Sequence, residues 1–436
     1  MYYFGFYFGQ THFGTKFADI QYGGNGNDVH YGFSGHDVFY SSQGKDTYWG
    51  GSGIDTVNYS NSLGRIHVNL GGNSVLEMNP TTGMFEEEKL YSIEVVHGSQ
   101  FNDTMIGSSG KDKFYGNKGD DYFVDTAGSD YYNGGSDTDT IDYYQSSDGV
   151  KVNLVSGQGH GGNAEGDIYH SIENVFGTNF NDEFWGSMSN SDFVGGNGDD
   201  VFHSSQGFDT FNGGIGNDTA DYSASDGAVG INLLYNEASG GHAQGDTLSG
   251  IESLVGSRYN DSLFGDGNNN LIHGGAGMDI ISTGSHGSTG WNETHGGSDR
   301  DIILAGGELG INHGDGGDDT LIATQGIQYL YGDSGDDELR NDGADAHMFG
   351  GAGSDSFQMA RKQSEQINTV IHDFEIGIDE LDFSQSGETD WEVIVGRAVS
   401  VSTVDGDGSQ FETMDGETVT LIGVDIDDLT YNDFSF

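Results

Sequence analysis

The stretch GGNGNDVHYGFSGHDVFYSSQGKDTYWGGSGIDTVNY, residues 23–59, decides the fold, because an aspartate stands at every ninth position of it. A catalytic site needs one or two well-placed carboxylates. A row of carboxylates at fixed spacing instead indicates a repeated structural unit. The first block of this row consists of Asp19, Asp28, Asp37, Asp46 and Asp55.

The composition shows that such a chain needs a partner charge. Its 436 residues include 70 acidic and 14 basic side chains, which gives a formal net charge of −56, and only 33% are apolar. This combination is typical of disordered chains, because little apolar area is available to offset chain entropy and charge repulsion. The 12% of aromatic residues and the fixed spacing of the acids argue against permanent disorder. We therefore expect a positive charge from outside the sequence to complete the fold.

Composition also excludes several classes of protein. The sequence has no cysteine, so neither a disulfide scaffold nor a thiolate metal site is possible. No run of 18 apolar residues is present, so no membrane span is predicted. The strong acidity argues against partners such as nucleic acid or anionic lipid. The N-terminal MYYFGFYFGQTHFGTKF lacks the basic and aliphatic regions of a cleaved signal peptide.

The same aspartate row recurs in three later blocks. The second block contains Asp103, Asp112, Asp121, Asp130 and Asp139. The third contains Asp182, Asp200, Asp209 and Asp218, with Ser191 in the missing position. The fourth contains Asp261, Asp279, Asp301, Asp319, Asp337 and Asp355, and its intervening positions hold Asn270, Gly310, Gln328 and Ala346. Four extra residues between Asp279 and Asp301 are interpreted as an inserted loop.

A longer period lies above the nine-residue one. The second, third and fourth blocks open with FND, FND and YND, 79 residues apart, and each follows a similar connector. HVNL, KVNL and GINL in these connectors alternate in a way that predicts short strands. The later segments SIE, SIE and GIE fit either a strand or a helical turn. Three copies of about eighty residues indicate internal duplication.

The nine-residue unit is approximately G-G-x-G-x-D-x-U-x, where U is a large apolar residue such as Phe39, Val57 or Phe202. It combines a glycine turn with a three-residue strand whose central side chain points inward. Two units form an 18-residue coil, and stacked coils form two parallel sheets with the U residues between them. His30 and Ala220 fit the apolar pattern of the U position only weakly.

The turns offer only oxygen ligands. Glycine allows positive φ and a close approach of carbonyls, and each turn adds one carboxylate. Calcium accepts 6–8 oxygens in flexible geometry, whereas zinc prefers nitrogen or sulfur. We therefore predict several Ca²⁺ ions, shared between stacked turns such as those of Asp37 and Asp55, with all aspartates of the four blocks as ligands. One edge of the fourth block, where alternate turns lack aspartate, is expected to bind calcium poorly.

These motifs resemble the RTX, or hemolysin-type calcium-binding, nonapeptide repeats, and the resemblance covers residues 19–355. It implies a parallel β-roll with calcium in its turns, type I secretion from an uncleaved C-terminal signal, and folding on extracellular calcium. Residues 356–436 resemble the C-terminal part of the repeat domain in serralysin-type proteases. The tail DDLTYNDFSF is similar to such a signal.

The predicted fold is all-β, with three or four short rolls, β connectors and a C-terminal β module. Residues 1–18 are interpreted as an aromatic cap that hides an open sheet edge. The repeat region spans 19–355, with blocks at about 19–60, 101–143, 180–222 and 259–357. Residues 356–436 are interpreted as the C-terminal module with a secretion-like tail.

The sequence contains no recognisable catalytic motif. HExxH and GxSxG are both absent, which argues against a zinc protease and an α/β-hydrolase, so no catalytic or further cofactor-binding residue is assigned. The favoured function is a secreted calcium-dependent binding or surface-structural module, with a polysaccharide or a cell surface as partner. The alternative is a lyase or C5-epimerase acting on a uronate polysaccharide. Its candidate residues are His12, Arg65, Tyr91, His97, His160, His170, His242 and Arg258.

Overall fold

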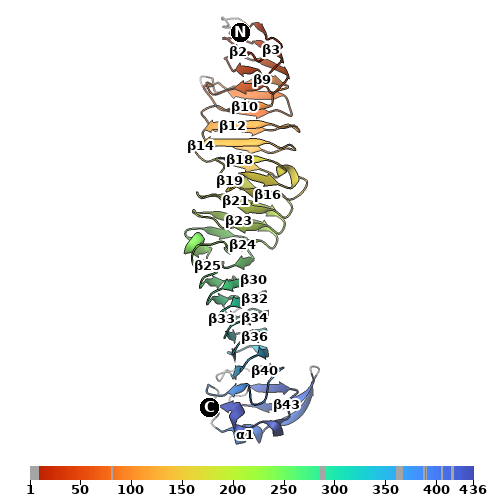
Figure 1. Cartoon of the computed structure of the whole chain (residues 1–436), viewed down its shortest axis with the longest axis vertical. Helices are drawn as coiled ribbons and strands as arrows, with labels where there is room; N and C mark the ends of the chain where they lie inside the picture. The colour runs from red at the N-terminus through yellow and green to blue at the C-terminus, as the bar shows by residue number, and fades with distance from the viewer. Residues whose placement is uncertain are drawn as a thin grey trace. The chain divides into compact units, whose positions relative to one another are not determined.

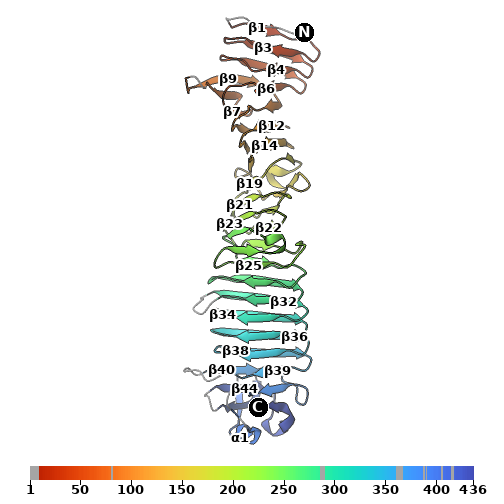
Figure 2. The same ribbon diagram turned by 90° about the vertical axis from the view of Figure 1, so that its left-hand side faces the viewer.

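The computed structural model describes residues 9–79, 82–284, 290–359, 367–385, 388, 390–403, 406–413 and 417–436. The chain divides into two compact units, Met1–Gly216 and Asn217–Phe436. Each unit is a stack of short strands in two facing parallel sheets (Figures 1 and 2). This arrangement confirms the predicted all-β parallel β-roll. The predicted aromatic cap lies largely outside the described residues, which begin at Gly9.

The first unit contains two sheets, and the strands of each pair with their neighbours in the following order. One sheet contains β1 (Thr11–Phe13), β3 (Val29–Ser34), β5 (Thr47–Ser52), β9 (Phe85–Tyr91), β8 (Ser74–Met78), β7 (Ile66–Asn69), β11 (Thr104–Ile106), β13 (Tyr122–Val124), β15 (Thr140–Asp142), β19 (Asn174–Phe176), β21 (Asp192–Asn197) and β23 (Thr210–Ile215). The other contains β2 (Ile20–Tyr22), β4 (Val38–Tyr40), β6 (Thr56–Asn58), β10 (Val95–His97), β12 (Lys113–Lys118), β14 (Tyr131–Ser136), β18 (Ile168–His170), β17 (Gln158–His160), β16 (Lys151–Asn153), β20 (Glu183–Trp185) and β22 (Val201–His203).

The second unit is built in the same way. One sheet contains β24 (Thr219–Asp221), β28 (Ser253–Val255), β30 (Asn270–Ala276), β32 (Trp291–Ser298), β34 (Leu309–Gly316), β36 (Ile327–Ser334), β38 (Asp345–Ala352), β40 (Asn368–Ile371), β44 (Thr418–Ile422), β43 (Gly406–Glu412) and β42 (Val399–Thr403). The other contains β26 (Glu237–Ser239), β25 (Gly230–Asn232), β29 (Ser262–Phe264), β31 (Ile280–Ser282), β33 (Ile302–Ala305), β35 (Thr320–Ala323), β37 (Glu338–Asn341), β39 (Ser356–Gln358), β41 (Glu380–Asp382) and β45 (Phe434–Ser435).

The remaining elements are strand β27 (Thr247–Ser249), the five-residue helix α1 (Trp391–Val395), and the 3₁₀ turns η1 (Gly162–Ala164), η2 (Gly241–Ala243), η3 (Ile426–Asp428) and η4 (Tyr431–Asp433). Helix α1 is capped by Asp390, whose side chain accepts the N–H of Glu392 at 3.0 Å, as an N-cap residue does.

The connectors are built into the roll and do not merely separate blocks. In the first connector, β6 pairs with β10 and β7 pairs with β11, both in parallel. The strands predicted from HVNL, KVNL and GINL are confirmed as β7, β16 and β25. The question left open for the SIE, SIE and GIE segments is answered by a bend followed by strands β10, β19 and β28. Each connector therefore continues the ladder between two aspartate blocks.

The insertion in the fourth block leaves the ladder intact. Asn270 of β30 faces Asn292 of β32, and Ile281 of β31 faces Ile303 of β33, so 22 residues are accommodated where other coils use 18. Residues 285–289 of the predicted loop lie outside the described residues. The C-terminal segment also extends both sheets, since β40 pairs with β38 and β41 with β39. The strand predicted in ETVTLIGV is confirmed as β44. The predicted boundary at residue 356 stays a prediction.

The core of each roll is a column of inward-pointing U residues. In the first unit, the ring of Phe202 lies 5.6 Å from that of Phe184 and 5.4 Å from that of Phe211, and all three side chains are fully buried. Because successive coils repeat in register, each U side chain packs between those of the coils above and below. Apolar burial in this narrow core is the main favourable term that the chain itself supplies.

Replacing Phe202 by alanine is expected to lower the free energy of unfolding by about 3–5 kcal/mol, because a ring is removed from a closely packed core. Phe208 is 62% exposed and provides the matched control, for which F208A should change stability by less than about 0.5 kcal/mol. Denaturant unfolding of both variants in saturating calcium measures the difference. Equal effects would contradict the assignment of Phe202 to the core.

Candidate metal centre: the carboxylate ladder

One hydrogen bond repeats along the rolls and links successive aspartates. The backbone N–H of Asp19 donates to Oδ1 of Asp37 at 2.8 Å, and the N–H of Asp37 donates to Oδ1 of Asp55 at 2.8 Å. The same bond, at 2.7–3.0 Å, joins Asp28 to Asp46, Asp103 to Asp121, Asp112 to Asp130, Asp121 to Asp139, Asp182 to Asp200, Asp261 to Asp279, Asp279 to Asp301, Asp301 to Asp319, Asp319 to Asp337 and Asp337 to Asp355. The aspartates therefore hold the coils in register.

The second oxygen of many of these carboxylates has no partner among the described residues. This Oδ2 atom is buried and makes no hydrogen bond in Asp37, Asp55, Asp121, Asp139, Asp279, Asp301, Asp319 and Asp337. A buried carboxylate oxygen without a donor or a cation is costly. These eight aspartates therefore need a positively charged partner.

Glycine makes the room around these oxygens. A Cβ atom on Gly116 would lie 2.0 Å from Oδ2 of Asp121, and one on Gly134 would lie 2.1 Å from Oδ2 of Asp139. The carbonyl oxygen of Gly134 also lies 2.5 Å from the Gly116 Cβ position. Each such turn thus brings a carboxylate oxygen and backbone carbonyls of stacked coils into one small region.

Eight further aspartates of the row have Oδ2 satisfied by a donor within the chain. In those that open the later blocks, the residue four positions earlier donates its backbone N–H: Ser99 to Asp103, Thr178 to Asp182 and Ser257 to Asp261, at 2.5–2.6 Å. Elsewhere the donors to Oδ2 are the N–H groups of Thr15 to Asp19, Gly24 to Asp28 and Ser108 to Asp112, and the hydroxyls of Ser42 to Asp46 and Ser205 to Asp209. The structure thus separates two classes of aspartate that are equivalent in the sequence pattern.

Burial raises the pKa of the ladder carboxyls above their ordinary value. The pKa of Asp121 is raised to about 8, and those of Asp301 and Asp319 to about 7. Desolvation is the largest cause in each case, neighbouring aspartates of the ladder raise the pKa further, and the backbone hydrogen bond from the preceding coil opposes the shift. Ionising these buried carboxyls at neutral pH therefore requires a counter-charge that the protein alone does not supply.

The donor set fits calcium. Carboxylate and carbonyl oxygens are the ligands that Ca²⁺ takes in flexible geometry, and the chain has no cysteine to offer a softer site. Such an ion would bind the partnerless Oδ2 atoms and occupy the space that the adjacent glycine leaves by having no Cβ. In the fourth block, where aspartate is missing, amides bond to each other instead: the N–H of Asn270 donates to Oδ1 of Asn292 at 3.0 Å. These positions present no unsatisfied carboxylate.

Sequence reasoning missed the acids with which the connectors extend the ladder. Glu94 accepts the N–H of Asp55 at 2.9 Å, and Glu173 accepts that of Asp139 at 3.0 Å. Glu252 accepts the N–H of Asp218 at 3.0 Å, Asp167 that of Asp130 at 2.7 Å, and Asp379 that of Asp355 at 3.0 Å. The available signal was the glutamate of SIE, SIE and GIE, which recurs every 79 residues. The last aspartate of each of the first three blocks is thus bound by this glutamate.

A second missed feature is a buried group of acids in the first unit. Asp125, Asp130 and Asp167 each place a carboxylate oxygen within 4.8 Å of the others. Asp125 stands five residues before Asp130, where other turns carry glycine. Burial and the adjacent Asp167 raise the pKa of the Asp125 carboxyl well above its usual range. Tyr132 donates its hydroxyl to Asp125 at 2.8 Å.

The residues considered for a polysaccharide enzyme are not gathered into one site. Tyr91 stacks on Trp49, His97 stacks on Tyr115, and Arg65 lies over Phe85. Of the candidates, only His12 belongs to a described group of histidine and carboxylate ligand atoms lying within 4.8 Å of one another. The arrangement offers no acid–base pair beside a carboxylate neutraliser in the part of the chain that the structure describes.

Within the described residues, no helix is long and apolar enough to cross a membrane. No curated protein matches the sequence. Among solved structures, the extracellular lipase LipA from Serratia marcescens matches at 17% identity and a TM-score of 0.16, over 60% of this chain and 40% of that chain. The present chain thus spans less than half the length of that lipase.

A family model provides the assignment. The model of the RTX calcium-binding nonapeptide repeat (4 copies) matches residues 22–57, 97–124, 107–141, 193–226, 246–281 and 313–345. These segments contain glycine turns and seven of the eight aspartates with partnerless oxygens, all except Asp301. The repeat motif, its 18-residue coil and its oxygen-only turns together identify these segments as RTX calcium-binding nonapeptide repeats.

Proposed function

We propose that this chain is a secreted protein whose β-rolls are completed by extracellular calcium and which serves as a binding or surface-structural module. The observation that carries the proposal is the row of buried Oδ2 atoms without a partner, each beside a glycine whose missing Cβ leaves room for an ion. The proposed ligands are the aspartates of the four blocks, with the eight that have partnerless oxygens as the strongest candidates.

The proposed mechanism is linkage between calcium binding and folding. An ion that binds the folded turns and not the unfolded chain stabilises the fold according to its free concentration. In a cytoplasm with little free calcium, the charge of −56 keeps the chain unfolded and competent for type I export. Outside the cell, calcium neutralises the ladder and the rolls form. The absence of cysteine is compatible with this route, since no disulfide has to form.

The outer face of the second unit favours a structural role. A column of rings crosses successive strands with centroid separations of 4.2–4.9 Å; it consists of His273, His295, His313, Tyr331, Phe349 and His372. Because the ring faces cover one another, the column presents ring edges and contributes cross-strand packing. It reinforces the sheet and offers no flat platform for a sugar ring. The polysaccharide lyase or epimerase stays an alternative without a site in the described residues.

A calcium titration followed by far-UV circular dichroism tests the proposal directly. We expect a cooperative change from a disordered to a β spectrum with calcium, and no such change with magnesium, which demands a tighter octahedron. The expected transition arises because the ion supplies the charge that the ladder lacks. A β spectrum that survives chelation unchanged would show that the fold stands without metal and would contradict the proposal.

Substituting a glycine that lies beside a partnerless Oδ2 atom tests the position of the ions. G116A is expected to raise the calcium concentration at the midpoint of folding, because its Cβ would occupy the space beside Asp121 Oδ2. Gly227 provides a matched control, since a Cβ there would meet its nearest atom at an ordinary 3.4 Å and G227A should leave the midpoint unchanged. Equal midpoints for the two variants would show that the space between Gly116 and Asp121 Oδ2 does not hold an ion.

The calcium-free chain should be more structured at acidic than at alkaline pH. A carboxyl with a folded pKa of about 7–8, as in Asp301 and Asp121, and an unfolded pKa of about 3.9 stabilises the fold while it is protonated. That stability is complete below the unfolded pKa and is lost as the pH rises through the folded pKa. We therefore expect the β content in chelator to fall between about pH 5 and pH 8, and saturating calcium to abolish this loss.

The carboxamide variant D121N separates the ladder from the general effect of net charge. It cannot ionise at the buried position and should retain more β content than wild type at pH 8 in chelator. D120N removes one charge from an exposed neighbour and should have a smaller effect. If both variants behave alike, net charge and not the buried ladder controls the pH dependence.

A further inference from the structure

The first coils of the roll break the rule that inward positions are apolar. His12 of β1, His30 of β3 and Tyr48 of β5 face one another in register, and Gln21 of β2 lies opposite them. His12 is 3% exposed, and His30 and Gln21 are fully buried. Equivalent positions elsewhere hold residues such as Phe39 and Phe202. Burying imidazoles in a narrow apolar core is unfavourable unless their nitrogens gain partners.

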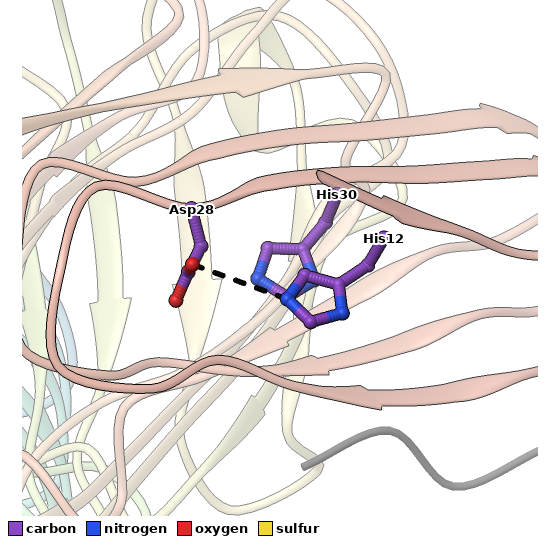
Figure 3. A group of neighbouring side chains, drawn as sticks. All are labelled: His12, Asp28 and His30. Carbon is purple, nitrogen blue, oxygen red and sulfur yellow. Dashed lines mark ion pairs between the residues drawn. The ribbon is translucent and has the colours of Figure 1, made fainter. Parts of the chain in front are cut away.

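These histidines converge with one carboxylate (Figure 3). The rings of His12 and His30 are stacked, with centroids 4.6 Å apart and planes inclined by 9°. Nε2 of His12 lies 4.0 Å from Oδ1 of Asp28. One ligand atom from each of the three residues lies within 4.8 Å of the other two, and all three side chains are buried. The group therefore offers two imidazole nitrogens and one carboxylate oxygen to a single point.

The tautomer of His30 is set by its neighbour. The amide nitrogen of Gln21 donates to the carbonyl of Tyr31 at 3.0 Å, which turns Oε1 of Gln21 toward Nδ1 of His30 at 3.1 Å. Nδ1 therefore carries the proton and donates it to Gln21. Nε2 of His30 is left with a lone pair that is buried and has no hydrogen-bond partner.

The hydrogen bond to Gln21 also suits His30 to metal binding. A hydrogen bond from the second ring nitrogen to a carbonyl oxygen, as from His30 to Gln21, is the usual support of a metal-binding histidine.

We propose that His12, His30 and Asp28 form a binding site for one divalent transition ion of the zinc class, separate in chemistry from the calcium turns. Two nitrogens and one oxygen match zinc, whereas calcium takes oxygen alone. Nitrogens on a tetrahedral zinc ion with bonds of about 2.0 Å lie about 3.3 Å apart, so the two stacked rings need to close by about an ångström. A water or another chain atom completes the coordination.

The proposed ion would fasten the end of the roll. β1 is the first described strand of its sheet and is held to β3 by three residue pairs. An ion bound by His12 of β1 and by Asp28 and His30 of the next coil would join the two coils through coordination bonds. The site would thus link β1 to the next coil of the first unit through a bound metal ion.

Cobalt spectroscopy on the full chain, folded in saturating calcium, tests the site. Co²⁺ is the probe, because a tetrahedral N/O site gives it intense visible absorption, and Zn²⁺ is then added as a competitor. We expect one tightly bound Co²⁺ that zinc displaces and that excess calcium does not. Absence of a zinc-displaceable cobalt signal in calcium-folded wild type would overturn the proposal.

Two variants assign the signal to these residues. H30F places at position 30 the side chain found at inward positions 39 and 202, so the core is retained while cobalt affinity should fall at least tenfold. Q21L should weaken binding by about 10–100-fold, as loss of a supporting hydrogen bond does. If H30F fails to acquire the calcium-induced β spectrum, H12Q provides the same measurement. Unchanged affinity in whichever of these folds would overturn the assignment.

A half-buried histidine group in the second unit provides the control for adventitious binding. His313, Asp315 and Asp333 also place ligand atoms within 4.8 Å of one another, but Nδ1 of His313 is already paired with Asp333 at 2.8 Å. H313A should leave the cobalt signal unchanged, and its loss in this variant would place the ion on the surface. Hydrogen exchange adds a structural readout: zinc should slow exchange in residues 11–13 and 29–31 of wild type but not of H30F.

Discussion

The structure depends on one constraint: an 18-residue coil that repeats in register places the same side chain directly above itself in every coil. For the inward apolar residues this is favourable, because Phe184 and Phe202 meet and exclude water. For the aspartates it is not, since like charges are stacked a strand spacing of about 4.8 Å apart. The hydrogen bond from each aspartate N–H to the next carboxylate offsets part of this repulsion and leaves one oxygen to be neutralised.

This constraint explains why the chain uses calcium as part of its fold. A lysine or arginine beside each carboxylate would neutralise it permanently, and folding would then not depend on an ion from the medium. The sequence instead has 14 basic residues against 70 acidic ones. The side chains that continue the ladder beyond the repeat blocks are again acidic. Glu94 and Glu173 continue the ladder through the connectors with the same polarity. The counter-charge therefore has to come from the medium, and the folded state becomes conditional on it.

Much of this was predictable from the sequence, because a period of nine fixes the coil, the inward residue and the turn together. The difference between aspartates with a bonded Oδ2 and those with a partnerless Oδ2 was not predictable. It depends on whether the residue four positions earlier turns its N–H toward Oδ2, as Ser99 does for Asp103. The connectors were predicted as spacers with strands, but their pairing across blocks depends on partners about 40 residues away. The glutamate of SIE could have been found, because it recurs with the 79-residue period.

The histidines of the first coils show which contacts a repeat pattern does not reveal in the sequence alone. His30 looks like a weak member of the apolar series when the sequence is read alone, because nothing local shows that position 12 lies directly over it. The register brings the two imidazoles and Asp28 together and buries all three. The roll then presents two kinds of cation chemistry on one scaffold. Oxygen-only turns along its length suit an abundant hard ion, and a nitrogen-bearing group at its end suits a scarcer and softer one, so the two ions need not compete for the same ligands except through Asp28.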